Sequence, residues 1–265
     1  MPKQYVSLLA LLVSLFVLTA CGSKAFNGLD KIKNRKKLVV AVSPDYALFE
    51  FRALVNGKSK IVGADIHLAQ AIADEFGVAL SLSPMSFNNV LASVASGKAD
   101  LAISGISYTK ERAKVYGFSN SYYDTENLVV IAASQVTKLT KLADLKGQKV
   151  GVQKGTIQET LAQKALTDSQ IVSLTDMGEI INEIKSGHLD AAVMDSPVAI
   201  GVESNNADIA VMKEGFEAST GDAKVIGMAK GNTSLQQVVN KVIKKVKGAT
   251  SEGYLSEVSK LTAQE

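Results

Sequence analysis

The stretch SGISYTKER, residues 104–112, surrounds one arginine with hydrogen-bond donors. Ser107 supplies a hydroxyl and a backbone N–H group, Thr109 can cap a short helical turn, and Arg112 falls within that turn. A guanidinium can form two parallel charge-assisted hydrogen bonds with a carboxylate, and the N–H groups at the start of a helical turn also favour an anion. The stretch therefore predicts a carboxylate site, with a surface arginine paired to Glu111 as the alternative.

An acidic residue with the complementary chemistry, Asp195, lies later in the chain. It follows an apolar run and precedes Pro197, so it can either hold an ammonium group or cap the next helix. The loop KGTI, residues 154–157, brings backbone N–H groups to the start of another helix. Tyr46 and Phe87 offer ring faces to a flat polar side chain, although a single aromatic residue is more often part of a core.

Short apolar runs alternate with helical patterns in both halves of the chain. Apolar residues three or four apart, as at Val90, Leu91 and Val94, predict helices. Because parallel strands need crossover helices between them, this alternation predicts parallel sheets and the α/β class. Strands are expected at 37–43, 79–83, 99–104, 148–153, 170–174 and 189–194, and helices at 66–76, 87–96, 156–166 and 177–186.

One motif occurs twice, as SGKADLA at 96–102 and SGHLDAA at 186–192. The recurrence predicts two similar βαβαβ lobes. A further strand at 224–230 and a helix at 234–247 would return to the first lobe, so the chain would cross between lobes twice and form a hinge. We expect these crossings near 128–134 and 220–226. Since open α/β sheets bind ligands at the carboxyl ends of their strands, two facing lobes would enclose a ligand cleft.

The N-terminus has the features of an export signal. Lys3 precedes an apolar run from Val6 to Val17, shorter than the roughly 20 residues needed to cross a bilayer. Cys21, the only cysteine, follows Leu-Thr-Ala and resembles the lipobox of bacterial lipoproteins. We expect removal of residues 1–20, a lipid on Cys21, and a polar, basic tether over 21–37. An ordinary secretory signal is the alternative.

The composition argues against several other classes of protein. The 265 residues are 46% hydrophobic, enough for one large or two small globular domains. A net charge of +3 gives no indication of a nucleic-acid partner. His67 and His188 are the only histidines and both occupy surface-like positions. Because G-x-S-x-G, a P-loop and a second cysteine are all missing, we expect no enzyme activity, cofactor or metal.

Residues 38 to about 262 resemble the amino-acid-binding receptors of bacterial ABC importers, the extracellular solute-binding proteins of family 3. The resemblance is carried by DYALFEF (45–51), IVGADIHLAQAIA (61–73), SGKADLAISGISYTKERAKVYGFSNSYY (96–123), VGVQKGTIQET (150–160) and GHLDAAVMDSPVA (187–199). It implies a periplasmic-binding-protein-like fold of type II, with two βαβ-type lobes joined by a two-strand hinge. Lobe 1 would span 38–130 and lobe 2 131–222, and 223–265 would return to lobe 1 with C-terminal helices.

The same resemblance implies how a free amino acid would be held. Arg112 would bind the α-carboxylate, with the backbone N–H groups of Ser107 and of Ile157. Asp195 would bind the α-ammonium, together with the Gly105 carbonyl and the Ser107 hydroxyl. The implied ligand-binding set is Ser43, Tyr46, Asp65, Phe87, Gly105, Ser107, Arg112, Thr156, Ile157, Gln158 and Asp195.

The side chain of the ligand is less well defined by the resemblance. Tyr46 and Phe87 would flank it, with Gln158 in reach. Ser43 stands where many members that bind basic amino acids or glutamine have an aspartate. A cationic side chain would therefore have to use one of three nearby acids, Asp45, Glu50 or Asp65. We expect arginine or histidine as the ligand, with lysine or glutamine as alternatives.

The resemblance also implies a biological setting. The protein would be a monomer, anchored through Cys21 on the outer face of the cytoplasmic membrane, either at the cell surface or on the periplasmic side. It would close around the amino acid and deliver it to the membrane subunits of an ABC permease. The alternatives are a periplasmic dehydratase-like enzyme of the same fold, and a lipoprotein that senses amino acids or acts as an adhesin.

Overall fold

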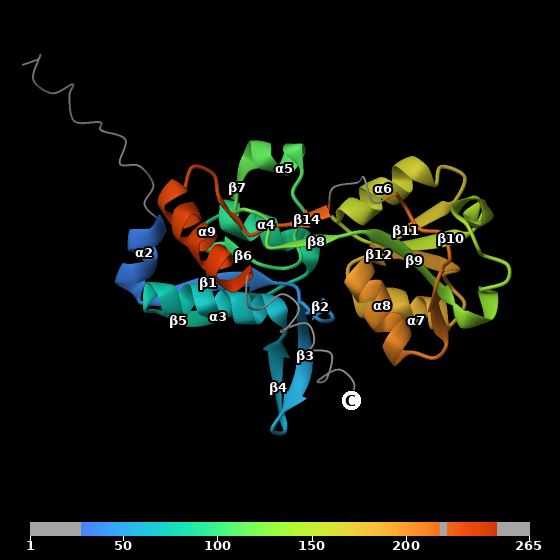
Figure 1. Cartoon of the computed structure of the whole chain (residues 1–265), viewed down its shortest axis with the longest axis horizontal. Helices are drawn as coiled ribbons and strands as arrows, with labels where there is room; N and C mark the ends of the chain where they lie inside the picture. Colours follow the sequence, from blue (N-terminus) through green and yellow to red (C-terminus); the bar gives the residue numbers. More distant parts are fainter. Residues whose placement is uncertain (1–27, 218–221, 248–265) are drawn as a thin grey trace, which may run out of the picture.

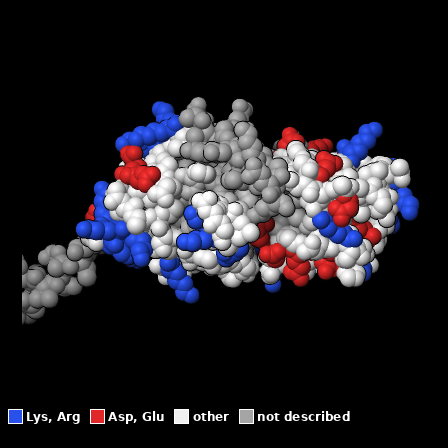
Figure 2. Space-filling view, turned by 90° about the horizontal axis from the view of Figure 1, so that it is seen from below, with Lys and Arg blue, Asp and Glu red and all other residues white. Residues whose placement is uncertain are grey.

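The computed structural model describes residues 28–217 and 222–247, which form two α/β lobes lying side by side (Figure 1). The predictions for residues 1–20, for Cys21 and for helices after 247 concern residues outside the described ones. Within the described residues, none of the helices is long and apolar enough to cross a membrane. Figure 2 shows basic and acidic side chains on both lobes, in keeping with the small net charge of +3.

Lobe 1 is built around a five-stranded sheet. Its strands follow the order β5 (Ala79–Pro84), β1 (Lys37–Val42), β6 (Leu101–Ala102), β15 (Gly227–Ala229) and β7 (Tyr116–Phe118). The first three are parallel, and β15 pairs antiparallel with both β6 and β7. The helices are α2 (Gly28–Arg35), α3 (Ala64–Phe76), α4 (Phe87–Ala95), α5 (Lys110–Val115) and α9 (Thr233–Lys247). A second sheet joins β2 (Asp45–Tyr46), β3 (Glu50–Val55) and β4 (Lys58–Val62).

Lobe 2 repeats the parallel part of this arrangement. Its sheet runs β11 (Gln170–Leu174), β10 (Lys149–Gln153), β12 (Ala191–Asp195), β9 (Asn127–Ala132) and β13 (Ile209–Val211). The first three strands are again parallel, and the pairs with β9 are antiparallel. Its helices are α6 (Ile157–Ala165), α7 (Met177–Lys185) and α8 (Ser196–Asn205), with short 3₁₀ turns η1 (Ala133–Gln135) and η2 (Leu142–Leu145).

Two short strands join the lobes. β8 (Tyr123–Thr125) pairs antiparallel with β14 (Asp222–Lys224), and Figure 1 shows both between the two bodies. The second crossing therefore falls where the sequence predicts it. The first lies a few residues earlier than predicted, because all of β9 belongs to the lobe 2 sheet. An apolar run such as LVVIAA suits a buried sheet strand as well as a hinge, so its sequence does not distinguish them.

The two copies of the repeated motif perform the same structural task. Asp100 accepts a hydrogen bond from the backbone of Val39 at 2.8 Å, and Asp190 accepts one from Lys149 at 2.8 Å. Each aspartate thus secures β1 or β10, the middle one of the three parallel strands in its own sheet. Gly97 and Gly187 end the preceding helices at φ values of 72° and 76°, a conformation that favours glycine.

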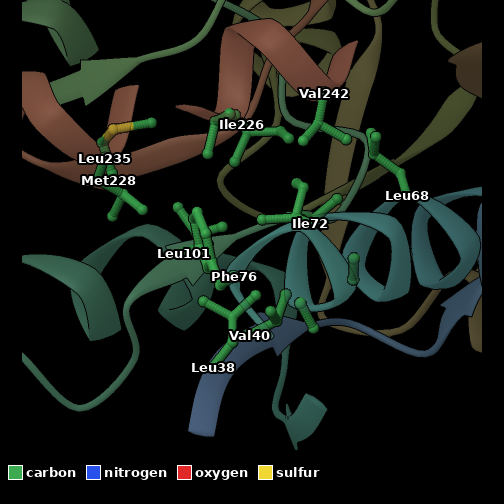
Figure 3. Close-up of a cluster of buried hydrophobic side chains, with 14 of the residues drawn as sticks. Leu38, Val40, Leu68, Ile72, Phe76, Leu101, Ile226, Met228, Leu235 and Val242 are labelled. Carbon is green, nitrogen blue, oxygen red and sulfur yellow. The ribbon is translucent and has the colours of Figure 1, made fainter. Parts of the chain in front are cut away.

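The core of lobe 1 confirms the predicted return of the C-terminal segment. In Figure 3 the side chains of Leu38 and Val40 from β1 and Ile72 from α3 lie in one cluster with Ile226 and Val242. All five side chains are almost completely buried. Burial of this kind stabilises a fold by about 1.5 to 3 kcal/mol for each large aliphatic side chain.

The predicted tether over 21–37 is wrong from residue 28 onward. Residues 28–35 form α2, whose Ile32 is fully buried in the lobe 1 core, and Arg35 is paired with Asp100. The prediction relied on the basic composition of this stretch and overlooked its short amphipathic pattern. Leu29 and Ile32 lie three residues apart and share one face of the helix. Lobe 1 thus begins with α2.

Candidate functional site

A cavity lies between the lobes and contains nine of the eleven predicted ligand-binding residues. Its empty volume, including its opening to solvent, is about 370 Å³. Lobe 1 contributes Tyr46, Phe87, Ser104, Gly105, Ser107 and Arg112, and lobe 2 contributes Gln153, Thr156, Ile157, Gln158, Met177, Val193, Met194 and Asp195. The two predicted residues that do not line it are Ser43 and Asp65.

Arg112 lies on α5, whose first turn is capped by the side chain of Thr109. The Thr109 hydroxyl accepts the Arg112 backbone N–H at 3.0 Å, as the sequence predicts. The guanidinium donates from Nη1 to the Ser107 carbonyl at 2.6 Å and from Nη2 to the Gly155 carbonyl of lobe 2 at 2.8 Å. These bonds hold the guanidinium at the cavity wall. The alternative from the sequence was a surface arginine paired with Glu111. Burial lowers the pKa of Arg112.

Asp195 ends β12 on the opposite wall and is only 4% exposed. It occupies the N-cap position of α8, as the alternative predicts, but its side chain makes no capping hydrogen bond there. Its Oδ1 accepts hydrogen bonds from Thr125 at 2.9 Å and Gln158 at 3.0 Å. Its Oδ2 accepts one from Lys224 at 2.8 Å and another from the Tyr46 hydroxyl. Burial raises the pKa of Asp195, and the charge of Lys224 opposes that rise.

Gly105 leaves room for the Tyr46 ring. Its φ is 52°, in the left-handed region, and a Cβ atom there would lie 2.6 Å from Tyr46 Cε1. Tyr46 also stacks on Phe49, with ring centroids 5.3 Å apart. Phe87 begins α4, as predicted, and its side chain lines the same cavity. The cavity therefore combines aromatic surfaces with charges of both signs.

Asp65 lies beneath the cavity floor, buried together with Glu50. Its Oδ2 accepts the Gly105 backbone N–H at 2.9 Å and the Tyr122 hydroxyl at 2.9 Å. The carboxyl of Glu50 accepts a hydrogen bond from Ser104 at 2.6 Å. Burial, followed by the charge of Asp65, holds the pKa of Glu50 well above its usual range. These two acids thus support the Ser104–Gly105 loop from below.

Ser43 and Asp45 lie beside the cavity at the boundary between the lobes. Ser43 donates its backbone N–H to Ser104 at 2.9 Å and its hydroxyl to Asp45 at 2.6 Å. Asp45 also accepts hydrogen bonds from the cavity residue Gln153 at 2.7 Å and from the backbone of Met177 at 3.0 Å. Burial raises the pKa of Asp45. This acid belongs to lobe 1 but is bonded mainly by lobe 2, so it joins the lobes.

The α6 end of the cavity follows the predicted capping pattern. The Thr156 hydroxyl accepts the Glu159 backbone N–H at 3.2 Å, and Ile157 is the first helical residue. Gln158 is buried and donates to Asn127 at 2.8 Å as well as to Asp195. The first turn of a helix carries free N–H groups and a positive dipole end, both of which favour an anionic ligand group.

The sequence analysis did not identify Lys224, although its ammonium group bonds two of the residues that line the cavity. It is only 1% exposed and contacts Asp195 and Ser107. A lysine among the apolar residues of a strand pattern is the available signal, since buried lysines are rare unless they are paired. Both histidines are exposed, as predicted. Among the described residues, no group of His, Cys, Asp and Glu could hold a metal ion.

Two α/β lobes, a pair of hinge strands and a charged cavity between the lobes together define a hinged solute-binding protein. The chain belongs to the bacterial extracellular solute-binding proteins, family 3, whose family model matches residues 38–257. It has the type II periplasmic-binding-protein-like fold, which confirms the fold class expected from the sequence.

The similar proteins bind amino acids. The chain is 32% identical to the arginine-binding extracellular protein ArtP of Bacillus subtilis, across 97% of each chain. It is 30% identical to a probable histidine-binding protein of Campylobacter jejuni, covering 79% of this chain and 80% of the relative. A solved amino-acid ABC transporter substrate-binding protein, AbpA of Streptococcus pneumoniae, bound to L-arginine, superposes with a TM-score of 0.86. It is 46% identical, with coverage of 89% of this chain and 100% of that one.

Proposed function

We propose that this protein is the arginine receptor of an ABC importer, which captures the free amino acid between its lobes and delivers it to a permease. One observation carries the proposal most directly. Arg112 of lobe 1 and Asp195 of lobe 2 line the same cavity from opposite sides. Both ends of a zwitterion can therefore be neutralised there, which a buried ligand requires because an unpaired buried charge is costly.

The ligand's α-carboxylate would lie against Arg112. Two of the five guanidinium N–H donors bind carbonyl groups, which leaves the other donors for the ligand. The backbone N–H groups of Ser107 and Ile157 would complete this half of the site. The α-ammonium would lie between Asp195, the Ser107 hydroxyl and the Gly105 carbonyl.

Arginine is the ligand we favour among the polar amino acids. Its planar guanidinium can stack between Tyr46 and Phe87, an interaction that contributes about 1 to 2 kcal/mol when water is excluded. Asp45 is the best-placed acid for its charge, because it is bonded to Gln153 and Met177, which both line the cavity. The arginine-binding relatives support this choice. Histidine, lysine and glutamine are the competing ligands.

Closure of the hinge would couple binding to transport. In the structure, Arg112 of lobe 1 already bonds Gly155 of lobe 2, so contacts of a closed form exist. A ligand that touches both walls stabilises this form in proportion to its extra contacts there. The permease would then recognise the closed shape.

A thermal-shift screen against the common amino acids tests the ligand. At about 100 times its Kd, a ligand adds about 2.7 kcal/mol of stability, a shift of several degrees for lobes of this size. We expect L-arginine to give the largest shift, and agmatine, which lacks the carboxylate, to give almost none. A larger shift with another amino acid would reject arginine as the ligand. No shift with any of them would reject the receptor role.

The cellular location is the second part of the proposal. Cys21 would carry the lipid that anchors the mature protein outside the cytoplasmic membrane, next to its permease. Replacement Cys21→Ser should release the protein from the membrane fraction while its binding of arginine stays the same. Unchanged fractionation of the variant would show that another feature anchors the chain.

A further inference from the structure

Lys224 occupies the place that the proposed function gives to the ligand's α-ammonium. It ends the hinge strand β14, and its Nζ lies 2.8 Å from Asp195 Oδ2 and 3.0 Å from Ser107 Oγ. These are the two side chains assigned above to the ligand's ammonium. The lysine is 1% exposed, and its ion pair with Asp195 is among the most buried in the described residues. An ammonium group of the protein therefore stands where a ligand ammonium is expected.

The hydrogen-bonding capacity of Asp195 is already full. A carboxylate offers about four lone-pair positions. Lys224 and Tyr46 bind one oxygen, and Thr125 and Gln158 bind the other. A ligand ammonium can reach this carboxylate only if one of these donors leaves. Lys224 is the only cation among these four donors, so its replacement by the ligand ammonium leaves the net charge around Asp195 unchanged.

Lys224 also lies near a second acidic group. Its charge acts on Asp65, which is buried beside Glu50 under the Ser104–Gly105 loop. This pair of acids is bound by Gly105 and Ser104, and its remaining oxygens have no hydrogen-bond donor among the described residues. The charge of Lys224 thus also favours the ionised form of Asp65.

We propose that Lys224 is a built-in occupant of the ammonium subsite, and that an amino acid must displace it from Asp195 in order to bind. This inference rests on the proposed function and specifies how it works. The two cations compete for one carboxylate, so Lys224 reduces what the ligand's amino group contributes to affinity. Removal of the lysine would leave the ligand as the only cation for Asp195, and the amino group would then contribute more.

Titration calorimetry with two ligands and three proteins tests this competition. The ligands are L-arginine and 5-guanidinopentanoate, which is arginine without its α-amino group. The proteins are the wild type, Lys224→Met and, as the matched control, Lys60→Met, which removes an exposed lysine from β4. The quantity compared is the Kd of the deaminated ligand divided by the Kd of arginine.

We expect this ratio to rise at least tenfold in Lys224→Met through tighter binding of arginine, and to stay within threefold of wild type in Lys60→Met. An unchanged or lower ratio in Lys224→Met would overturn the proposal. If wild type binds another amino acid and not arginine, the proposed ligand is wrong, and the ratio is measured with that amino acid and its deaminated form.

A double variant guards against misfolding, because Lys224→Met alone leaves the buried Asp195 without its counter-ion. Lys224→Met with Asp195→Asn removes both charges of the pair together. The proposal expects this variant to bind the two ligands with Kd values within threefold of each other. If the double variant still prefers arginine as strongly as wild type does, the amino group is recognised elsewhere and Lys224 does not compete for it.

Discussion

Replacement of Arg112 gives the sharpest test of the carboxylate site. Its two terminal nitrogens are held by Ser107 and Gly155, so the guanidinium is already oriented before a ligand arrives. A hydrogen bond to a charged group contributes about 1.5 to 3 kcal/mol, so loss of two should cost about 3 to 6 kcal/mol. At about 1.4 kcal/mol for each factor of ten, Arg112→Ala should weaken arginine binding by roughly 10²- to 10⁴-fold.

Arg112→Lys separates the effect of charge from that of geometry. It keeps the cation but has no planar pair of donors, so we expect an intermediate loss of roughly 10- to 100-fold. Lys110→Ala, an exposed residue on the same helix, is the control and should bind like wild type. The assay is titration calorimetry at constant ionic strength, with circular dichroism melting to check the fold. If Arg112→Ala binds within tenfold of wild type, this arginine is not the carboxylate partner.

Two further predictions concern the loop that supports the cavity. Since the pKa of Glu50 is raised in the folded state, wild type loses stability as the pH rises above about 4.5, the unfolded value, toward the folded pKa. Glu50→Gln mimics the protonated acid, so its melting temperature should gain on wild type as the pH rises above about 4.5. A constant or shrinking difference would contradict this. Gly105→Ala should lower the stability of the folded protein by about 1 to 2 kcal/mol, because its left-handed backbone disfavours a side chain, and should also displace the Tyr46 ring. Gly187→Ala is the control, because position 187 has a similar φ but open space around its Cβ. Calorimetry should show weaker arginine binding for Gly105→Ala only. Equal binding by both variants would show that the position of the Tyr46 ring does not affect binding.

Much of the site could be predicted from the position of residues relative to strand ends. Arg112 and Asp195 follow corresponding strands of two repeated units, and parallel sheets place such positions along one edge. The repeated aspartates Asp100 and Asp190 also marked the two units, because each secures the middle one of the three parallel strands in its sheet. Local sequence patterns were therefore enough to predict the position of a residue whose role depends on its own strand or helix.

Other features depend on contacts that no local pattern records. Lys224 pairs with Asp195, 29 positions away, and with Ser107, 117 positions away. Glu50 and Asp65 come from a hairpin strand and a helix, and only the fold buries them side by side. A sequence shows that such charged residues exist, but tertiary packing decides which of them share one counter-ion.

The interrupted course of lobe 1 has a consequence for how the chain is assembled. The lobe 2 sheet uses one continuous segment and is complete once β13 has been made at Val211. The lobe 1 sheet still lacks β15 at that stage, and this strand lies between β6 and β7. During synthesis or export from the N-terminus, the lobe 2 sheet can thus reach its native topology while the lobe 1 sheet, begun earlier, still lacks the strand that joins β6 to β7.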